Sequence, residues 1–331
     1  MENVGKSTNL HFIKNSKKNI LFVDRDIDVD NNAIVDSLNS VCYDMIIFDD
    51  ATQYRQGFLV NDFFVKLKTL NLSRPWIILT SDFTFYRSSE EQIVYYPYHC
   101  FVNLDVCRTI EVDIKNLRNN YLGFLPWHLY FVRLLFLLKF VQQDWFNKCL
   151  VNYLPENILT DFQKKILYSS VQQLSPQELF NLNQFHIDFP NGLVADINDD
   201  RLELQYINNC ANTDCYINFM IESEYDSPFI TEKTIKPYLC GQFSAVLGNN
   251  LLYNHLEEIG IDIFKDYLDM YVPNVDIRER VDLTIEKLSK FMFNIEQSWI
   301  ETYPRRLENY NYVRSTSFVD KLEFKIKQWV N

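Results

Sequence analysis

The residues best suited to chemistry lie in one stretch, residues 215–248. A polar turn over residues 222–228 is followed by Thr231-Glu232-Lys233, which begins a segment with apolar residues at helical spacing. A helix N-terminus presents unpaired N–H groups and about half a positive charge, so it can hold a phosphate. Lys233 adds a cation in the first turn, and Glu232 can accept hydrogen bonds from a ribose diol. These features predict a nucleotide diphosphate site without a glycine-rich loop.

The same residues have a purely structural interpretation. Glu232 would then complement the helix dipole, Lys233 would be solvated, and the segment would only pack. Spacing alone gives the two interpretations about equal weight.

Two strands and a helix must position this site. Residues 216–221 are apolar and rich in β-branched and aromatic side chains, which predicts a buried strand. The helix that follows buries Ile235 and Leu239 and should stop at Gly241. Residues 243–247 predict a second buried strand. In such a crossover the loop leaves the carboxyl end of the first strand, where open α/β sheets bind ligands.

Residues 216–269 carry a further pattern. Glu-Ser follows the first strand, Thr-Glu-Lys comes after seven intervening residues, and the second strand ends in Leu-Gly. This arrangement resembles the donor-binding signature of the family 10 glycosyltransferases, the α1,3-fucosyltransferases, and of related phage and virus proteins. In that family the glutamate contacts the ribose of a GDP-sugar and the lysine contacts its diphosphate. The resemblance therefore implies these roles for Glu232 and Lys233.

The chain departs from the family pattern at two places. The family usually has Glu-Asn-Ser where residues 221–223 are Ile-Glu-Ser, which leaves the identity of the sugar open. Pro237 lies inside the expected helix and should kink it. The expected donor-binding residues are Glu232, Lys233, Thr231, Ser223, Glu222, Tyr225, Arg133 and His128.

Arg133 and His128 belong to an earlier turn and helix. Residues 120–125 predict a strand, and residues 129–141 predict a buried amphipathic helix. In the resembled proteins the start of this helix carries a basic residue that holds the diphosphate. Arg133 is the equivalent cation here and His128 is the alternative. A surface cation on an amphipathic helix is an equally weighted interpretation of Arg133.

The N-terminal part of the chain alternates strands with helices, which predicts a parallel sheet covered on both faces. The expected strands are residues 19–24, 43–48, 76–79 and 99–104, and the expected helices are residues 31–41 and 61–70. The fold class is therefore α/β. The resemblance implies two Rossmann-like domains that face a cleft, which is the GT-B type. Residues 1–112 would then form the domain that binds the acceptor, and residues 113–302 the domain that binds the donor. Residues 303–331 would form a helical tail that packs back on the first domain.

Other elements are expected from the same periodicity. They are a strand over residues 149–153 and helices over residues 161–170, 176–182, 251–260, 275–299 and 318–330. His255 lies in one of these helices, where a structural role is favoured over a catalytic one.

The catalytic base should be a carboxylate of the first domain, because an inverting transfer needs a group that takes the proton of the acceptor hydroxyl. In the resembled family it is a glutamate just after the third strand. Asp82 lies at that place and is the hypothesis, followed by Glu90, Glu91 and Asp50. The alternative is a structural role, because a carboxylate at the end of a strand often only caps the strand and takes no part in catalysis.

No metal site is expected. The acidic run over residues 24–30 lacks both the glycine and the final glutamate of an EF-hand loop, so a solvated acidic loop is favoured over a metal-binding Asp-x-Asp. Cys210 and Cys215 have no second pair or nearby histidine that would complete a zinc set. The odd number of cysteines, seven, indicates reduced thiols and a cytoplasmic protein.

The amino-acid composition limits the kinds of partner that this chain is expected to bind. A formal net charge of −12 disfavours nucleic acid, and seven glycines leave no dinucleotide or Walker motif. The longest apolar segment, residues 129–141, is too short to span a bilayer, so no stable membrane insertion is expected.

The resemblance implies a glycosyltransferase that moves fucose or a related hexose to an acceptor hydroxyl. The donor substrate is a GDP-sugar, or a UDP-sugar, and no cofactor or metal is required. A glycan acceptor is favoured over DNA. The alternatives are glycosylation of modified bases in viral DNA and a catalytically degenerate scaffold that binds nucleotide or glycan.

Overall fold

The computed structural model describes residues 18–24, 30, 32–40, 43–49, 60–82, 85, 89–96, 108, 111–124, 126, 128–153, 156, 159–190, 193, 214–222 and 230–330. The chain divides into two compact units. The first consists of Met1–Val102, Ser227–Glu232 and Ser315–Asn331, and the second of Asn103–Asp226 and Lys233–Arg314.

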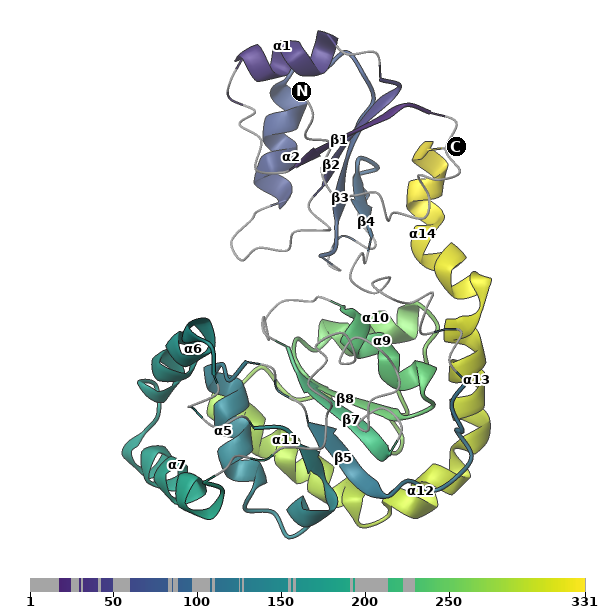
Figure 1. The fold of residues 1–331 in the computed structure, drawn as a ribbon. Helices are drawn as coiled ribbons and strands as arrows, with labels where there is room; N and C mark the ends of the chain where they lie inside the picture. Colours follow the sequence, from purple (N-terminus) through teal and green to yellow (C-terminus); the bar gives the residue numbers. More distant parts are fainter. Residues whose placement is uncertain are drawn as a thin grey trace. The chain divides into compact units, whose positions relative to one another are not determined.

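The first unit is built on a four-stranded parallel sheet with the order β1-β2-β3-β4 (Figure 1). Its strands are β1 (Ile20–Asp24), β2 (Met45–Asp49), β3 (Trp76–Thr80) and β4 (Ile93–Tyr95). Its helices are α1 (Asn32–Ser40), α2 (Val60–Thr69) and α14 (Thr316–Val330). Strands β2 and β3 are buried along their whole length, as expected for central strands of a parallel sheet, and the edge strand β4 is buried as well because α14 packs beside it.

Aromatic side chains join α2 to this sheet. Phe48 of β2 meets Phe63 of α2 edge to face, with ring centroids 5.6 Å apart, and meets Trp76 of β3 at 6.3 Å. All three side chains are buried. The apolar face of α2 therefore closes one side of the hydrophobic core.

The C-terminal helix α14 completes the first unit. It packs beside β4 (Figure 1) and buries Phe318, Leu322 and Ile326. The Trp329 indole N–H donates to the backbone carbonyl of Glu91, and Lys18 Nζ donates to the carbonyl of Trp329 at 2.6 Å. Both ends of the described chain therefore belong to this unit.

The second unit is built on another four-stranded parallel sheet, with the order β6-β5-β7-β8. Its strands are β5 (Asn120–Phe124), β6 (Leu150–Val151), β7 (Cys215–Ile221) and β8 (Phe243–Leu247). Its helices are α5 (Phe131–Phe140), η3 (Phe146–Lys148), α6 (Asp161–Val171), α7 (Pro176–Asp188), α9 (Glu232–Leu239, of which Glu232 is grouped with the first unit), α10 (Leu251–Glu258), α11 (Ile277–Met292), α12 (Ile295–Glu301) and α13 (Tyr303–Arg314).

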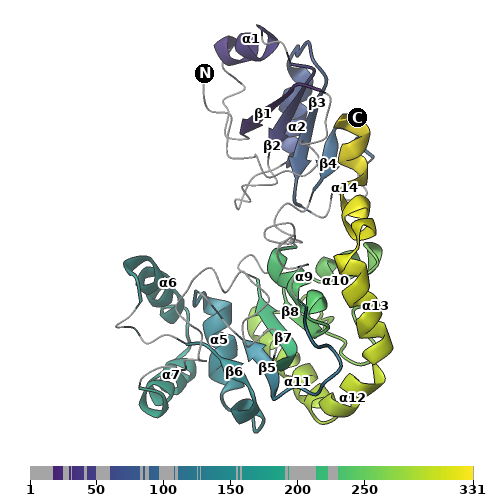
Figure 2. The ribbon, with the colours of Figure 1, turned by 45° about the vertical axis from the view of Figure 1, so that its right-hand side comes forward.

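Helix α5 is the centre of this unit. It is apolar on nearly every side because it packs against α6, α7 and α11 (Figure 2) and against the sheet. Phe136 stacks on Phe219 of β7, with ring centroids 4.4 Å apart. The expected buried helix is confirmed, and its burial fixes the position of the residues at its N-terminus.

The expected α/β class is confirmed, with two parallel sheets. Strand β4 was not expected, and the strand expected over residues 99–104 lies outside the described residues. The single long helix expected over residues 275–299 is wrong. The chain breaks there into α11 and α12, because Asn294, with φ −124° and ψ 19°, leaves helical geometry after Phe293, whose side chain is 86% exposed.

Within the expected tail, residues 303–331, the structure forms two helices. Helix α13 is grouped with the second unit and α14 with the first. The expected domain limits at residues 112 and 302 stay predictions.

Candidate functional site

The carboxyl edge of the second sheet is where the expected donor-binding residues gather. Strands β5, β7 and β8 are parallel, and Ile221 is in register with Leu247. The N–H of Glu222 still donates to the Leu247 carbonyl at 3.2 Å, so Glu222 and Gly248 leave the sheet side by side. The loops after these strands consequently start from one edge.

Helix α9 brings Lys233 to this region. Ile235, Tyr238 and Leu239 are about 1% exposed, whereas Lys233 is exposed in the first turn. Thr234, next to it, is fully buried. The predicted burial of Ile235 and Leu239 is confirmed, but Lys236 is also buried, at 4% exposure, so α9 is covered on all sides beyond its first turn and Lys233 is exposed at that first turn.

Gly241 ends α9 as the sequence predicts. Its φ is +63°, its N–H donates to the Tyr238 carbonyl, and the N–H of Gln242 donates to the Pro237 carbonyl at 2.8 Å. This pair of bonds is the Schellman arrangement, which needs a left-handed residue after the helix. Pro237 has no N–H to donate to the Lys233 carbonyl, yet the helix continues through it to Leu239.

Glu222 is a buried carboxylate behind the start of α9. It is 8% exposed and accepts a hydrogen bond from the Thr234 hydroxyl at 3.4 Å. Gly248 packs against it, since a Cβ at Gly248 would lie 3.5 Å from Glu222 Cγ. The Leu-Gly ending of β8 therefore leaves room for the carboxylate at the position where the resembled family has asparagine.

Arg133 is buried rather than a surface cation, because α5 lies inside the unit. It is 7% exposed. Its Nε and Nη2 donate to the Ile221 carbonyl at 3.0 and 2.8 Å, and Nη1 donates to the His128 carbonyl at 3.0 Å. Burial lowers the pKa of the guanidinium, and Glu222 opposes this shift. A guanidinium stays protonated under such conditions, so Arg133 is a buried positive charge that ties the loop after β5 to the end of β7.

His128 is half-buried between aromatic rings. Its ring centroid lies 5.6 Å from that of Phe162 and 6.0 Å from that of Tyr130. Burial lowers the pKa of His128, and the charges of Arg133 and Lys233 lower it further. The imidazole is therefore neutral at physiological pH, when it can donate one hydrogen bond and accept another.

The structure thus brings together four of the expected donor-binding residues: Arg133, His128, Glu222 and Lys233. Thr231 is buried. Ser223, Tyr225 and the side chain of Glu232 lie outside the described residues, so their predicted roles stay predictions.

Arg280 belongs to the same edge and was not expected. It lies on α11, is 4% exposed, and its Nη2 donates to the Gly248 carbonyl directly after β8. The sequence does contain a signal for it. Arg280, Thr284 and Leu288 are spaced four residues apart on α11, so they lie on the same face of the helix. Thr284 and Leu288 are fully buried, which places Arg280 on the buried face.

The expected catalytic carboxylates are in the first unit. Asp82 lies two residues after the end of β3, is half-buried, and its N–H donates to Thr80 Oγ1 at 3.2 Å. Glu90 is exposed and pairs with Lys68 at 3.2 Å, and the Glu91 side chain is also exposed. Among these, Asp82 has the expected place at a strand end. Asp50 lies outside the described residues.

Other candidate groups have structural positions. His255 is fully buried, and burial lowers its pKa to about 3, as expected for a core histidine. Asp30 pairs with Lys66 at 2.9 Å, and the other side chains of the acidic run lie outside the described part. Cys149, Cys215 and Cys240 are free thiols. In the described part of the chain, no group of three or more His, Cys, Asp or Glu residues could hold a metal ion.

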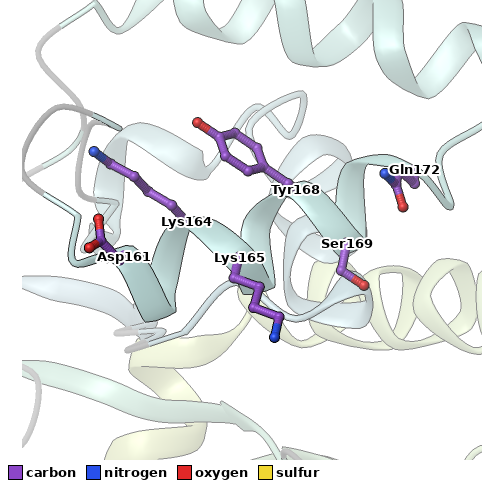
Figure 3. Close-up of a pocket in the computed structure, with 6 residues that line it drawn as sticks. All are labelled: Asp161, Lys164, Lys165, Tyr168, Ser169 and Gln172. Atoms are coloured by element: carbon purple, nitrogen blue, oxygen red, sulfur yellow. The ribbon is translucent and has the colours of Figure 1, made fainter.

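Two surface depressions of the second unit involve none of the expected site residues. One, of about 460 Å³, is lined by Asp161, Lys164, Lys165, Tyr168, Ser169 and Gln172 (Figure 3). These residues come from α6 and the residue that ends it, so the depression is a feature of one helix surface. The other, of about 710 Å³, lies between residues 266–269 and helices α11 and α12.

Among the described residues, no helix combines the length and the apolar character needed to cross a membrane. Neither a protein family, nor a curated protein, nor a solved structure matches this chain.

Proposed function

We propose that this chain is a glycosyltransferase. It transfers a hexose, fucose or a related sugar, from a nucleotide-diphosphate sugar to an acceptor hydroxyl, and the donor is GDP-linked or UDP-linked. The observation that carries the proposal is the carboxyl edge of the second parallel sheet, where the exposed Lys233 in the first turn of α9 accompanies the buried guanidinium of Arg133. Cationic groups and a helix N-terminus are the features that bind a diphosphate.

In this proposal each residue at the edge has a separate role. Lys233 contacts the diphosphate, Glu232 accepts hydrogen bonds from the ribose, and Arg133 supplies a fixed positive charge behind them. Positive charge placed where the diphosphate leaves stabilises the transition state more than the ground state, because the leaving group gains charge as the sugar departs. The proposal therefore needs no metal ion.

Asp82 is proposed as the base of an inverting transfer in the GT-B arrangement that the resemblance implies. The acceptor oxygen forms a bond to the anomeric carbon, the bond from that carbon to the diphosphate oxygen breaks, and the acceptor proton moves to the carboxylate. The half-buried position of Asp82 at a strand end supports this role. A glycan is the proposed acceptor, because a net charge of −12 disfavours DNA.

A melting-temperature screen against GDP, UDP, CMP and their sugars tests the donor site. A nucleotide at a hundred times its Kd should stabilise the native state by about 2.7 kcal/mol, which raises the melting temperature measurably. Lys233→Met should weaken the binding of the selected nucleoside diphosphate about tenfold by loss of one charge contact. Lys165→Met, at an exposed position of α6, is the matched control and should bind as the wild type does.

Failure of every nucleoside diphosphate to stabilise the chain would overturn the proposal. Transfer assays with labelled donor separate the remaining alternatives. Label in DNA but not in an oligosaccharide would support the modified-base reaction, and binding with neither hydrolysis nor transfer would support a scaffold.

A further inference from the structure

The larger of the two surface depressions described above has the size of a ligand pocket. It measures about 710 Å³ and lies between residues 266–269 and helices α11 and α12, and we call it the α11–α12 depression. Small-molecule sites commonly measure about 300 to 1,000 Å³. Its lining comes from residues 266–301, so all of it belongs to the second unit.

The α11–α12 depression is a different place from the candidate site. None of the described residues that line it is an expected donor-binding or catalytic residue. Its α12 wall includes Ser298, and the next residue, Trp299, donates its indole N–H to the Asn116 carbonyl at 3.0 Å. Asn116 precedes β5, so this wall lies toward the amino ends of the strands, whereas the candidate site lies at their carboxyl edge.

The buried part of the lining is mainly apolar and adjoins a fixed aromatic ring. Leu268 and Phe291 are 5% and 6% exposed. The half-buried Tyr267 donates its hydroxyl to Glu301 at 3.2 Å, and the Arg305 guanidinium lies 5.8 Å from its ring centroid. A tyrosine held at both its hydroxyl and its ring offers a rigid apolar surface with a polar tip.

Ion pairs form much of the rim of this depression. Lys287 Nζ donates to the backbone carbonyl of Asp269 at 2.8 Å and to its carboxylate at 3.3 Å, and Lys290 Nζ donates to Glu286. An ammonium group has three N–H donors and a carboxylate has about four acceptor positions. Each paired group therefore keeps hydrogen-bonding capacity for a ligand.

Amide side chains extend the rim across the break between the two helices. Gln297 Nε2 donates to Glu301 Oε1 at 2.7 Å. Asn294 is exposed at the start of α12, where its side chain makes no cap hydrogen bond. Because an amide both donates and accepts, the rim presents donors and acceptors close to one another.

The charges of the lining disfavour an anionic ligand. The ionised side chains that line the depression are four carboxylates and two ammonium groups: Asp266, Asp269, Glu286, Glu301, Lys287 and Lys290. Each of these lysines already lies beside a carboxylate, so a phosphate or carboxylate ligand would approach the lysine against the repulsion of that carboxylate.

A saccharide has the chemistry that this lining fits. Each hydroxyl of a sugar donates and accepts, which suits a rim of carboxylates, amides and ammonium groups. One face of a sugar ring carries C–H groups, which pack on an aromatic ring and on apolar side chains such as those of Tyr267 and Leu268. A neutral sugar also brings no charge that would disturb the ion pairs.

We propose that the α11–α12 depression binds a neutral saccharide. A sugar ring packs against Tyr267, and Asn294 and Gln297 supply hydrogen bonds to its hydroxyls. The proposed function needs no second saccharide site, so this inference goes beyond it and does not rest on it.

Saccharide binding to the full chain tests the proposal, measured by saturation-transfer NMR and calorimetry with lactose, cellobiose, maltotriose and N-acetyllactosamine. At least one of them should bind. Tyr267→Ala should raise the Kd of that saccharide about tenfold or more through loss of the packing surface, and Asn294→Ala should raise it about threefold to tenfold. Asn294 is exposed and caps no helix through its side chain, so Asn294→Ala keeps the test decisive if Tyr267→Ala does not fold.

Tyr168→Ala is the matched control. Tyr168 is 49% exposed and its hydroxyl donates to Glu156, much as that of Tyr267 donates to Glu301, but it lines the depression on α6. This variant should bind the saccharide as the wild type does. A sulfated disaccharide prepared from heparin should bind about tenfold or more weakly than the neutral saccharide, because its charges meet the carboxylates of the lining.

Lack of binding of all four saccharides would overturn this inference, and so would binding that Tyr267→Ala and Asn294→Ala leave unchanged. Equal or tighter binding of the sulfated disaccharide would contradict it as well. The nucleotide screen is independent of these measurements. A chain that binds a nucleoside diphosphate but no saccharide retains the proposed function alone, and the reverse result retains this inference alone.

Discussion

At the scale of single residues, Asp82 is the group whose role can be tested most directly. We predict that Asp82→Asn lowers kcat for sugar transfer by about 10²- to 10⁴-fold, because the amide cannot take the acceptor proton. The Kd for GDP should stay within about a factor of two, since Asp82 is not one of the proposed donor-binding residues. Glu90→Gln is the control, because that exposed carboxylate pairs with Lys68. Normal turnover in Asp82→Asn would exclude it as the base.

The residues of the candidate site differ in how far the sequence could predict them. Lys233 could be placed in the first turn of α9 from the sequence, but its exposure does not follow from the helical period, because Lys236 one turn later is buried. The burial of Arg133 was not predictable, because an arginine within an apolar helix is equally compatible with a side chain that reaches solvent. Arg280 was missed for a related reason: its carbonyl partner, Gly248, is 32 residues away in the chain, and no local pattern reports such a contact.

At the scale of elements, the end of α9 depends on Gly241. We predict that Gly241→Ala lowers the free energy of unfolding by about 2 kcal/mol or more, because an L-residue is strained at a φ of +63° and its Cβ would lie 2.7 Å from Ile114 Cγ2. Urea unfolding checks this, and the midpoint should fall while the m-value is unchanged.

Gly248→Ala is the matched control for that measurement. The nearest atoms to its new Cβ lie at 3.5 Å, an ordinary contact distance, so the loss of stability should be under about 1 kcal/mol. Equal stability of the two variants would contradict the role given to the left-handed glycine.

Helices and strands could be predicted where apolar residues recur at regular spacing over a long, uninterrupted segment. Strands β1, β2 and β3 and helix α2 follow from their apolar runs and alternation. Strand β4 has only three residues, which is too short a segment for a strand pattern to be recognised in the sequence. The break between α11 and α12 escaped prediction because charged and apolar faces continue through Phe293, although its side chain contacts solvent.

At the scale of the whole molecule, α14 makes the first unit depend on the last residues of the chain. We predict that Ile326→Ala destabilises the first unit by about 2 to 5 kcal/mol, because this side chain is fully buried. Hydrogen exchange followed by mass spectrometry should show lost protection in β1 to β4 and unchanged protection in β5 to β8. Phe324→Ala, at a position that is 61% exposed, is the control and should leave both units unchanged. Equal loss of protection in both sheets would show that they unfold together.

The place of α14 also has a consequence for biosynthesis. The ribosome makes β1 well before α14, with an interval of about 15 to 60 s between them at about 5 to 20 residues per second. Until α14 is made, β4 lacks its covering helix, whereas the second unit ends at Arg314 and is complete before α14 begins. An uncovered edge strand is open to pairing with other chains, so we expect the N-terminal part of the first unit, Met1–Val102, to be prone to aggregation until α14 is made.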